Sequence, residues 1–391
     1  MLQFVFLCAL ASVAKSYTLI RIPLGSFNGP PGHQLKLIHV ALGGGPNTLS
    51  NPQQWHIPNI TIRFHPAGVI GPMHLENDMK LAHENGNLLQ QRYAPFLKSY
   101  EQPLHPHLIE LRNPHNFNVT QSHVLSALNA IKGKPFCTDL RIHAPSEDLL
   151  PPVKHSLIND ITRVHNPDAC PAFYKKFKNL FGTHDNIMSE FRDHLKNVMN
   201  RFPQFKDDPE KLGFLHDLSK YNDQNGALPT CKGEGEVIKT MSRKVYETAF
   251  SITSLKRLSA GRYVSHLLDD VDHLRTKGET PDGKKMVLFG TTPPFLKSIM
   301  SAMGGDEGYH SENLLPHPEA GSMFITEVYQ KVEEQTYHIR LHYSNNPSQP
   351  ISDKNILKLR GCDELCEFDK FKNLMKPMYL SKDDADKECL E

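Results

Sequence analysis

The chain has 391 residues, and its 44 Lys and Arg against 43 Asp and Glu give a formal net charge of +1 at neutral pH. This balance argues against a nucleic-acid-binding protein, because such proteins carry a basic excess. Hydrophobic residues make up 39% of the chain, which supports a large packed core and is too high for a disordered protein. At about 150 residues per domain, this length predicts two or three units or one large α/β domain.

The first 16 residues are typical of a secretory signal peptide. An apolar run extends from Met1 to Ala14, and the small residues Ala14 and Ser16 suit cleavage there. The competing interpretation is a buried N-terminal strand. No stretch reaches the roughly 18 apolar residues of a membrane-spanning helix. We therefore expect a secreted protein, or one of the lysosomal lumen, that binds neither membrane nor nucleic acid.

Six cysteines follow this segment, and an even number in a secreted chain favours disulfide bonds. They are Cys137, Cys170, Cys231, Cys362, Cys366 and Cys389. A zinc site is the competing interpretation of the spacing between Cys362 and Cys366, but no CxxC or HxxxH pair accompanies it. Asn59 and Asn118 each begin a glycosylation sequon, which fits a secreted protein.

After a Pro- and Gly-rich lead-in over residues 17–33, apolar patterning predicts alternating strands and helices. The predicted strands cover residues 35–42, 286–290, 323–330 and 337–343, and the predicted helices cover 76–97, 121–131 and 295–303, with a mostly helical region over 173–274. Strands at both ends of the chain indicate an α/β body over residues 34–140 and 276–391. A mostly helical insertion over residues 141–275 interrupts this body.

Several segments resemble the histidine acid phosphatases of the lysosomal and prostatic type. Lys284–Thr292 resembles the strand that carries that family's His-Asp-Thr-Thr motif, and Leu359–Cys366 resembles its tail. Met79–Leu97 resembles the helix that follows its first motif. The likeness covers about residues 34–390 in the same order. It implies a central mixed sheet flanked by helices, a largely helical cap and a homodimer.

The positions that carry the chemistry of that family differ in this chain. The family's nucleophilic His lies in an Arg-His-Gly-x-Arg-x-Pro loop, where this chain places Gly44 or, in a second register, Leu42. Its phosphate-binding Arg corresponds to Val119, and its His-Asp pair corresponds to Phe289 and Gly290. Phosphoryl transfer needs an in-line nucleophile, cationic groups on the phosphate oxygens and a general acid. The resemblance therefore implies a phosphatase homologue that is not an enzyme.

We call these positions the strand-end site. It comprises Ala41, Leu42, Gly43, Gly44, Gly45, Asn47, Val119, Phe289 and Gly290. Without Arg, His and Asp, the site should be neutral and apolar, and should either take a small neutral or apolar ligand or be filled and silent. Two further readings stay open: an acid phosphatase with residual or repurposed activity, and an abundant secretory or storage protein without a specific ligand.

The remaining motifs indicate neither a cofactor nor a metal. The three glycines after the first strand lack both nucleotide-binding spacings, GxGxxG and GK[ST]. His39 is expected to be a packed or edge-exposed histidine, and Asp269–Asp272 the solvent face of a helix. The family resemblance pairs Cys170 with Cys389 and Cys362 with Cys366, which leaves Cys137 and Cys231 as the third pair.

Overall fold

The structure is a computed structural model, of which the following part is described. This part comprises residues 29–44, 72–97, 108–113, 118–136, 153–155, 170–183, 240, 243–244, 246–310, 317–345 and 349–391. The predicted signal peptide, Asn59 and the pair Cys137 and Cys231 lie outside it, as do Gly45 and Asn47 of the strand-end site.

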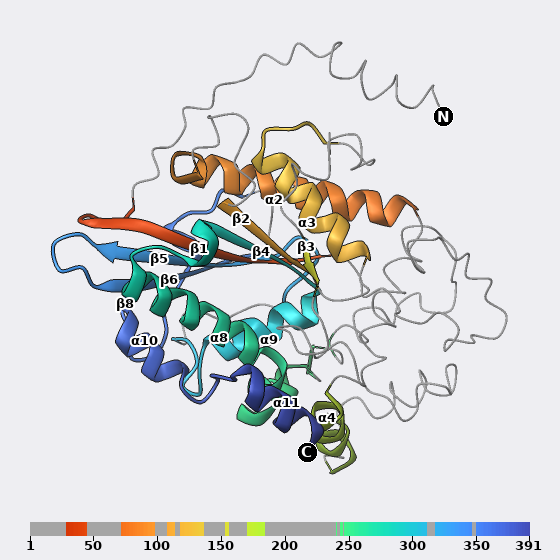
Figure 1. Ribbon diagram of the computed structural model, residues 1–391. Helices are drawn as coiled ribbons and strands as arrows, with labels where there is room; N and C mark the ends of the chain where they lie inside the picture. Colours follow the sequence, from red (N-terminus) through yellow and green to blue (C-terminus); the bar gives the residue numbers. More distant parts are fainter. Residues whose placement is uncertain are drawn as a thin grey trace.

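In the described part of the chain, a mixed sheet of eight strands forms the centre (Figure 1). Its strands are β1 (His33–Gly43), β2 (Ile109–Asn113), β3 (Val153–His155), β4 (Met286–Thr291), β5 (Met323–Lys331), β6 (Tyr337–Ser344), β7 (Ile356–Leu357) and β8 (Cys366–Glu367). The order is β3-β2-β4-β1-β5-β6-β7, with β8 paired to β6. Strands β3, β2, β4 and β1 are parallel, whereas β5 runs antiparallel to β1.

Helices cover both faces of the sheet, which confirms the predicted α/β class (Figure 1). They are α2 (Pro72–Leu97), α3 (Asn118–Ile131), α4 (Pro171–Thr183), α8 (Thr253–Lys277), α9 (Pro293–Met303), α10 (Phe368–Met375) and α11 (Lys382–Leu390). Helices α2 and α3 lie on one face, and α8, α9 and α10 on the other. Among the described helices, none combines the length and the apolar character needed to cross a membrane.

Strand β1 is the middle of this arrangement and is buried on both faces. Ile38, Val40 and Leu42 pack into the core beneath α2 and α3, whereas Leu37 and Ala41 pack into the core beneath α8 and α9. A strand enclosed by helices on both sides needs apolar residues at successive positions, which explains its nearly continuous apolar run.

Two segments of the predicted insertion over residues 141–275 contact the central sheet. Residues 153–155 form β3, which pairs with β2 in the sheet. The last part of the insertion lies in α8, whose Asp270 contacts His39 of β1. The pattern missed β3 because a strand of this length shows no recognisable alternation.

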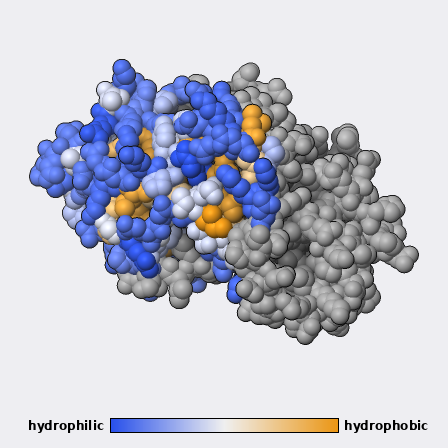
Figure 2. Space-filling model, turned by 90° about the horizontal axis from the view of Figure 1, so that it is seen from below, coloured by the Kyte–Doolittle hydropathy of each residue, from blue (hydrophilic) through white to orange (hydrophobic). Residues whose placement is uncertain are grey.

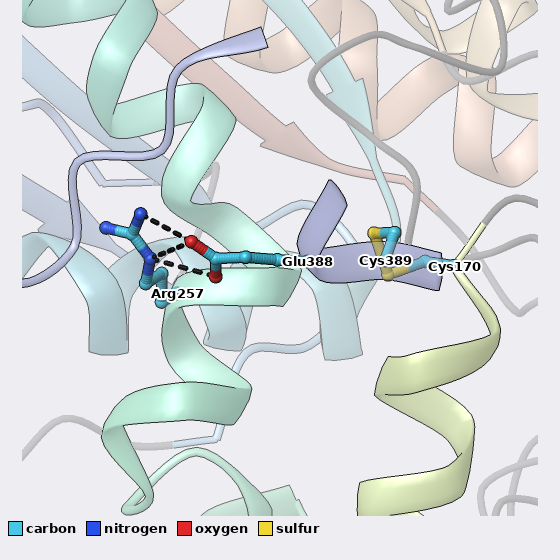
Figure 3. The surroundings of a disulfide bond; sticks show 4 residues. All are labelled: Cys170, Arg257, Glu388 and Cys389. Carbon is cyan, nitrogen blue, oxygen red and sulfur yellow. Dashed lines mark hydrogen bonds and ion pairs between the residues drawn. A yellow bond between two sulfur atoms is a disulfide. The ribbon is translucent and has the colours of Figure 1, made fainter. Parts of the chain in front are cut away.

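The carboxyl-terminal helix α11 is fastened to two separate helices (Figure 3). Cys389 is bonded to Cys170 at the start of α4, and Glu388 forms an ion pair with Arg257 of α8 at 2.7 Å. A second disulfide joins Cys362 to Cys366. Both pairings expected from the family resemblance are therefore present, and the link between Cys137 and Cys231 stays a prediction.

The face that carries α8, α10 and α11 is mainly hydrophilic (Figure 2). Its apolar areas are separate from one another, and the large hydrophobic residues most exposed in the described part are Val332 and Leu390. Scattered apolar residues of this kind are normal on the surface of a folded domain.

A buried ionic cluster fixes α2 to the sheet through Glu327 of β5. Its Oε1 accepts hydrogen bonds from Tyr93 Oη at 2.6 Å and Arg92 Nε at 3.0 Å. Its Oε2 accepts one from Tyr329 Oη at 2.7 Å and lies 2.9 Å from His342 Nε2. Burial alone would raise the pKa of Glu327, but His342 and Arg92 outweigh it and hold this pKa well below its ordinary value of 4.5.

Glu327→Gln should lower the free energy of unfolding at pH 7 by about 3–5 kcal/mol, because it leaves buried partners uncompensated. Since the folded-state pKa is depressed, the stabilisation by Glu327 is present above the unfolded value and is lost as pH falls below about 4.5. Urea titrations between about pH 7 and pH 3 should therefore show a smaller difference between wild type and variant at the acid end.

The matched control is Glu334→Gln, which alters an exposed carboxylate in the turn between β5 and β6. It should change stability little at any pH. A difference between wild type and Glu327→Gln that does not shrink on acidification would show that the carboxylate charge is not what holds this cluster.

Candidate functional site

The carboxyl ends of β1 and β4 meet at one edge of the sheet. The two strands are parallel neighbours in the register Leu42 with Gly290 and Gly43 with Thr291. Ligand sites in open α/β sheets lie outside the carboxyl ends of such strands. The structure therefore brings together two segments, around residue 43 and residue 290, that are far apart in the sequence.

Hydrogen bonds hold the end of β1 on both sides. The Gly44 N–H donates to the Thr291 carbonyl at 2.7 Å, and Thr291 Oγ1 donates to the Leu42 carbonyl at 2.9 Å. On the other side, the Gly43 N–H donates to the Ser322 carbonyl at 2.8 Å. Gly44 is thus the first residue beyond the strand, whereas Leu42 is paired within the sheet on both sides. Of the two registers considered for the nucleophile loop, this geometry favours the one that uses Gly44.

The described side chains of the strand-end site are packed rather than open. A Cβ atom built on Gly43 would lie 3.0 Å from Leu296 Cδ2 and 3.2 Å from the Ser322 carbonyl oxygen. Phe289 is 1% exposed, and its ring centroid lies 4.8 Å from that of Tyr263 and 5.6 Å from that of His39. Leu296 and Phe289 therefore fill the space beside the strand ends.

Ala41 and Leu42 of the strand-end site lie on opposite faces of the sheet. Successive side chains of a strand point to opposite faces, so Leu42 packs beneath α2 and α3, whereas Ala41 and Phe289 pack beneath α8 and α9. Val119 is in the first turn of α3, as the resemblance implied for the phosphate-binding position.

Charged side chains that the sequence analysis did not single out lie close to the same edge. Lys297 follows Leu296 in α9 and is buried, and Arg243 lies 3.8 Å from Glu319. Burial lowers the pKa of Lys297, while Glu247 opposes that shift. The Glu319 carbonyl oxygen would lie 3.4 Å from a Cβ on Gly43. The surroundings of the site are thus more charged than its own residues suggested.

A second group of polar side chains lies deeper, beneath α8, and we call it the His39 cluster. Its members are His39, Glu110, Arg112, His266, Asp270 and Lys284. His39 Nε2 and Asp270 Oδ2 lie 3.0 Å apart, and Lys284 Nζ lies 2.9 Å from Asp270 Oδ1 and 3.2 Å from Glu110 Oε2. Phe289 separates this cluster from the strand ends, because its ring contacts those of both His39 and His266.

The cluster keeps its imidazoles neutral and its carboxylates ionised. Burial lowers the pKa of His39 to about 4, against the opposing effect of Asp270, and it also lowers the pKa of His266. Burial would raise the pKa of Asp270, but the neighbouring His39, His266 and Lys284 lower it below its ordinary range. At pH 7 the described members therefore carry two negative and two positive charges.

His39 is a packed histidine, which confirms one of the two expectations for it. The expectation for Asp269–Asp272 was wrong at one residue, because Asp270 is only 3% exposed and faces the sheet. A helix that lies on a sheet turns one residue of any short acidic run inward. Neither Glu110 nor Lys284 stood out in the sequence, since their partners are far away along the chain and no local pattern marks them.

Comparison with known proteins finds acid phosphatase-like relatives. The chain is 24% identical over 261 residues to acid phosphatase-like protein XcAP-2 of Xenopsylla cheopis, an alignment that covers 62% of this chain and 67% of the relative. It is 23% identical over 248 residues to XcAP-1 of the same organism, an alignment that covers 59% of this chain and 64% of the relative. The chain thus spans about two thirds of the length of these relatives. No protein-family model matches it.

The solved structures that are similar to this chain include bacterial phytases. Klebsiella sp. ASR1 phytase matches with a TM-score of 0.59 at 11% identity and covers 88% of this chain and 96% of its own. Hafnia alvei phytase in complex with tartrate matches with a TM-score of 0.57 at 11% identity, and the match covers 90% of this chain and 99% of the phytase. At these identities the likeness establishes a shared fold.

The packing at the strand ends predicts that Gly43→Ala destabilises the protein by about 1–3 kcal/mol, because the added methyl group meets Leu296 and a backbone carbonyl. Leu296→Ala should cost about 2–5 kcal/mol by leaving a cavity. In the double variant the new methyl group occupies part of that cavity. The loss of unfolding free energy in the double variant, measured by denaturant unfolding, should therefore be smaller than the sum of the losses in the two single variants. Additive losses would mean that Leu296 does not fill this space.

Proposed function

Because the chain belongs to the histidine acid phosphatase family, we propose that it is a secreted member which does not hydrolyse phosphomonoesters and serves as a binding protein. The observation that carries this proposal is the identity of the first residue beyond β1. Gly44 stands where the family resemblance places the nucleophilic His, and glycine has no side chain to attack phosphorus.

The partner positions on β4 support the same conclusion. The resemblance places the family's His-Asp pair at Phe289 and Gly290, and Gly290 is the register partner of Leu42 beside the nucleophile position. The Phe289 ring is buried and neither donates nor accepts a proton. A general acid contributes about 10²–10⁴-fold to such reactions, so the nucleophile and the acid are missing together.

For the ligand we propose a small neutral or apolar molecule held against the strand ends. The described residues of the strand-end site are Ala41, Leu42, Gly43, Gly44, Val119, Phe289 and Gly290, and none has an ionisable side chain. A phosphate at this place would lack the paired charge that buried anions need. The nearby cations Arg243 and Lys297 are themselves balanced by Glu319 and Glu247.

A second candidate is an abundant secretory protein without a specific ligand. The observation that favours it is the packing of Leu296 and Phe289, which fill the space beside the strand ends. In either case we propose that residues 1–16 are removed on secretion and that the mature chain is a homodimer, as the family resemblance implies.

The deciding experiment is a phosphatase assay on the secreted, disulfide-intact protein. A chromogenic phosphomonoester is offered between about pH 4 and pH 8, with vanadate as inhibitor and an active histidine acid phosphatase as positive control. We expect turnover at the level of the uncatalysed reaction across the whole range. Vanadate-sensitive turnover would contradict the proposal and would place the nucleophile on one of the chain's 22 histidines.

Native mass spectrometry of protein isolated from its source separates the two candidates. A binding protein should carry an added mass that is released on denaturation, whereas the second candidate predicts the bare polypeptide mass. A bare mass would remove the ligand from the proposal and leave the loss of catalysis untouched.

A further inference from the structure

The His39 cluster contains three donor groups that converge although they come from two different elements. We propose that His39 of β1 together with His266 and Asp270 of α8 forms a binding site for a divalent cation of the zinc type. This inference does not depend on the proposed function, because the three residues lie behind Phe289 and outside the strand-end site.

The distances suit a shared ion. One ligand atom from each of the three residues lies within 4.8 Å of the other two. Asp270 Oδ2 is 3.0 Å from His39 Nε2 and 3.8 Å from His266 Nε2. Donor atoms around tetrahedral zinc, bound at about 2.0–2.2 Å, lie roughly 3.3–3.5 Å apart, so small movements would close the site around an ion.

Two imidazole nitrogens of the group, His39 Nδ1 and His266 Nε2, are buried without a hydrogen-bond partner among the described residues, and His266 Nε2 is the one near Asp270 Oδ2. The His266 nitrogen lies 3.6 Å from Glu110 Oε1 and 3.8 Å from Asp270 Oδ2, which is too far for a hydrogen bond to either. A buried polar atom without a partner costs about 1–3 kcal/mol, and an ion between His266 and Asp270 would satisfy it.

The residue types are those of zinc ligands. His39 Nε2 hydrogen bonds with Asp270 Oδ2, so the His39 ring must carry its proton on Nδ1 before Nε2 can bind an ion, and Nδ1 has no partner among the described residues. Two imidazole nitrogens and one carboxylate oxygen are a recurrent zinc ligand set that leaves a fourth position for water.

The neighbouring charges hold the carboxylate in place and limit the affinity. Lys284 contacts Asp270 through Oδ1, whereas Oδ2 faces the two histidines. Glu110 is held by Arg112 and Lys284, so it orients the cluster as an outer-shell group. Because the two carboxylates are already balanced by two cations, an ion adds net positive charge. We therefore expect weaker binding than at a structural zinc site.

The test is a cobalt titration of the folded, chelator-treated protein near neutral pH, read by visible absorption. Co²⁺ should bind with a stoichiometry of one per chain. It should give the absorption of a tetrahedral site with two nitrogen ligands, one carboxylate oxygen and one water, and Zn²⁺ should displace it. Zn²⁺ should also raise the thermal unfolding midpoint, since a ligand that binds only the folded state stabilises it.

His266→Gln is the deciding variant, because this side chain lies at the margin of the cluster and is the more exposed of the two histidines. It should lower the affinity for Co²⁺ by more than the roughly 10–100-fold that loss of an outer-shell partner costs. His39→Gln should do the same where it folds. His273→Gln is the matched control, since it removes a histidine of the same helix outside the group and should bind Co²⁺ like wild type.

Absence of Co²⁺ binding and of any midpoint shift with Zn²⁺ in the wild-type protein would overturn the proposal and leave the cluster as a buried ion-pair network. Binding that persists unchanged in His266→Gln would also overturn it, because the ion would then lie elsewhere among the chain's histidines.

Discussion

The parallel pairing of β1 with β4 is the constraint on which the rest of the structure depends. It fixes which residues emerge side by side at the carboxyl edge of the sheet, with Gly43 opposite Thr291 and Gly44 hydrogen bonded beyond it. It also fixes how much room they have, because α9 follows β4 directly and places Leu296 against Gly43. The chemistry available at this edge is therefore set by a few residues on two short segments.

The stability of the fold comes from contacts away from those positions. Two cores, one on each face of the sheet, enclose β1, and the ionic cluster at Glu327 ties α2 to β5. The bond between Cys170 and Cys389 joins residues 219 positions apart in the sequence and constrains the unfolded chain. None of these contacts uses Gly44 or Gly290, so the architecture does not depend on the side chains at those positions.

The parts of the fold that follow local patterns were predictable from the sequence. The continuous apolar run of β1, the helix period of α2 and the alternation in β6 each marked an element correctly. Strands β2 and β3 were missed because they are short and their pairing depends on β4, which is distant in the chain. The sheet position of α8 was missed for the same reason.

The candidate site was likewise predictable from the sequence only in part. The identity of Gly44, Phe289 and Gly290 could be read from the family resemblance, but their packing could not. Whether Leu42 faces the same space as Phe289 depends on strand alternation and on which helix covers each face. The His39 cluster was invisible in the sequence, because Glu110, Asp270 and His39 meet only through the sheet and α8. Asp270 was misplaced because a run of acidic residues in a helix usually faces solvent.

The most direct test of the account is an attempt to trap a phosphorylated enzyme. The secreted protein is mixed with a radiolabelled phosphomonoester, quenched under alkaline denaturing conditions that preserve phosphohistidine, and analysed for label on the polypeptide. The account predicts no covalent label, because Gly44 offers no nucleophile. A labelled histidine peptide would contradict it, and its position would show which residue attacks phosphorus in place of the residue beyond β1.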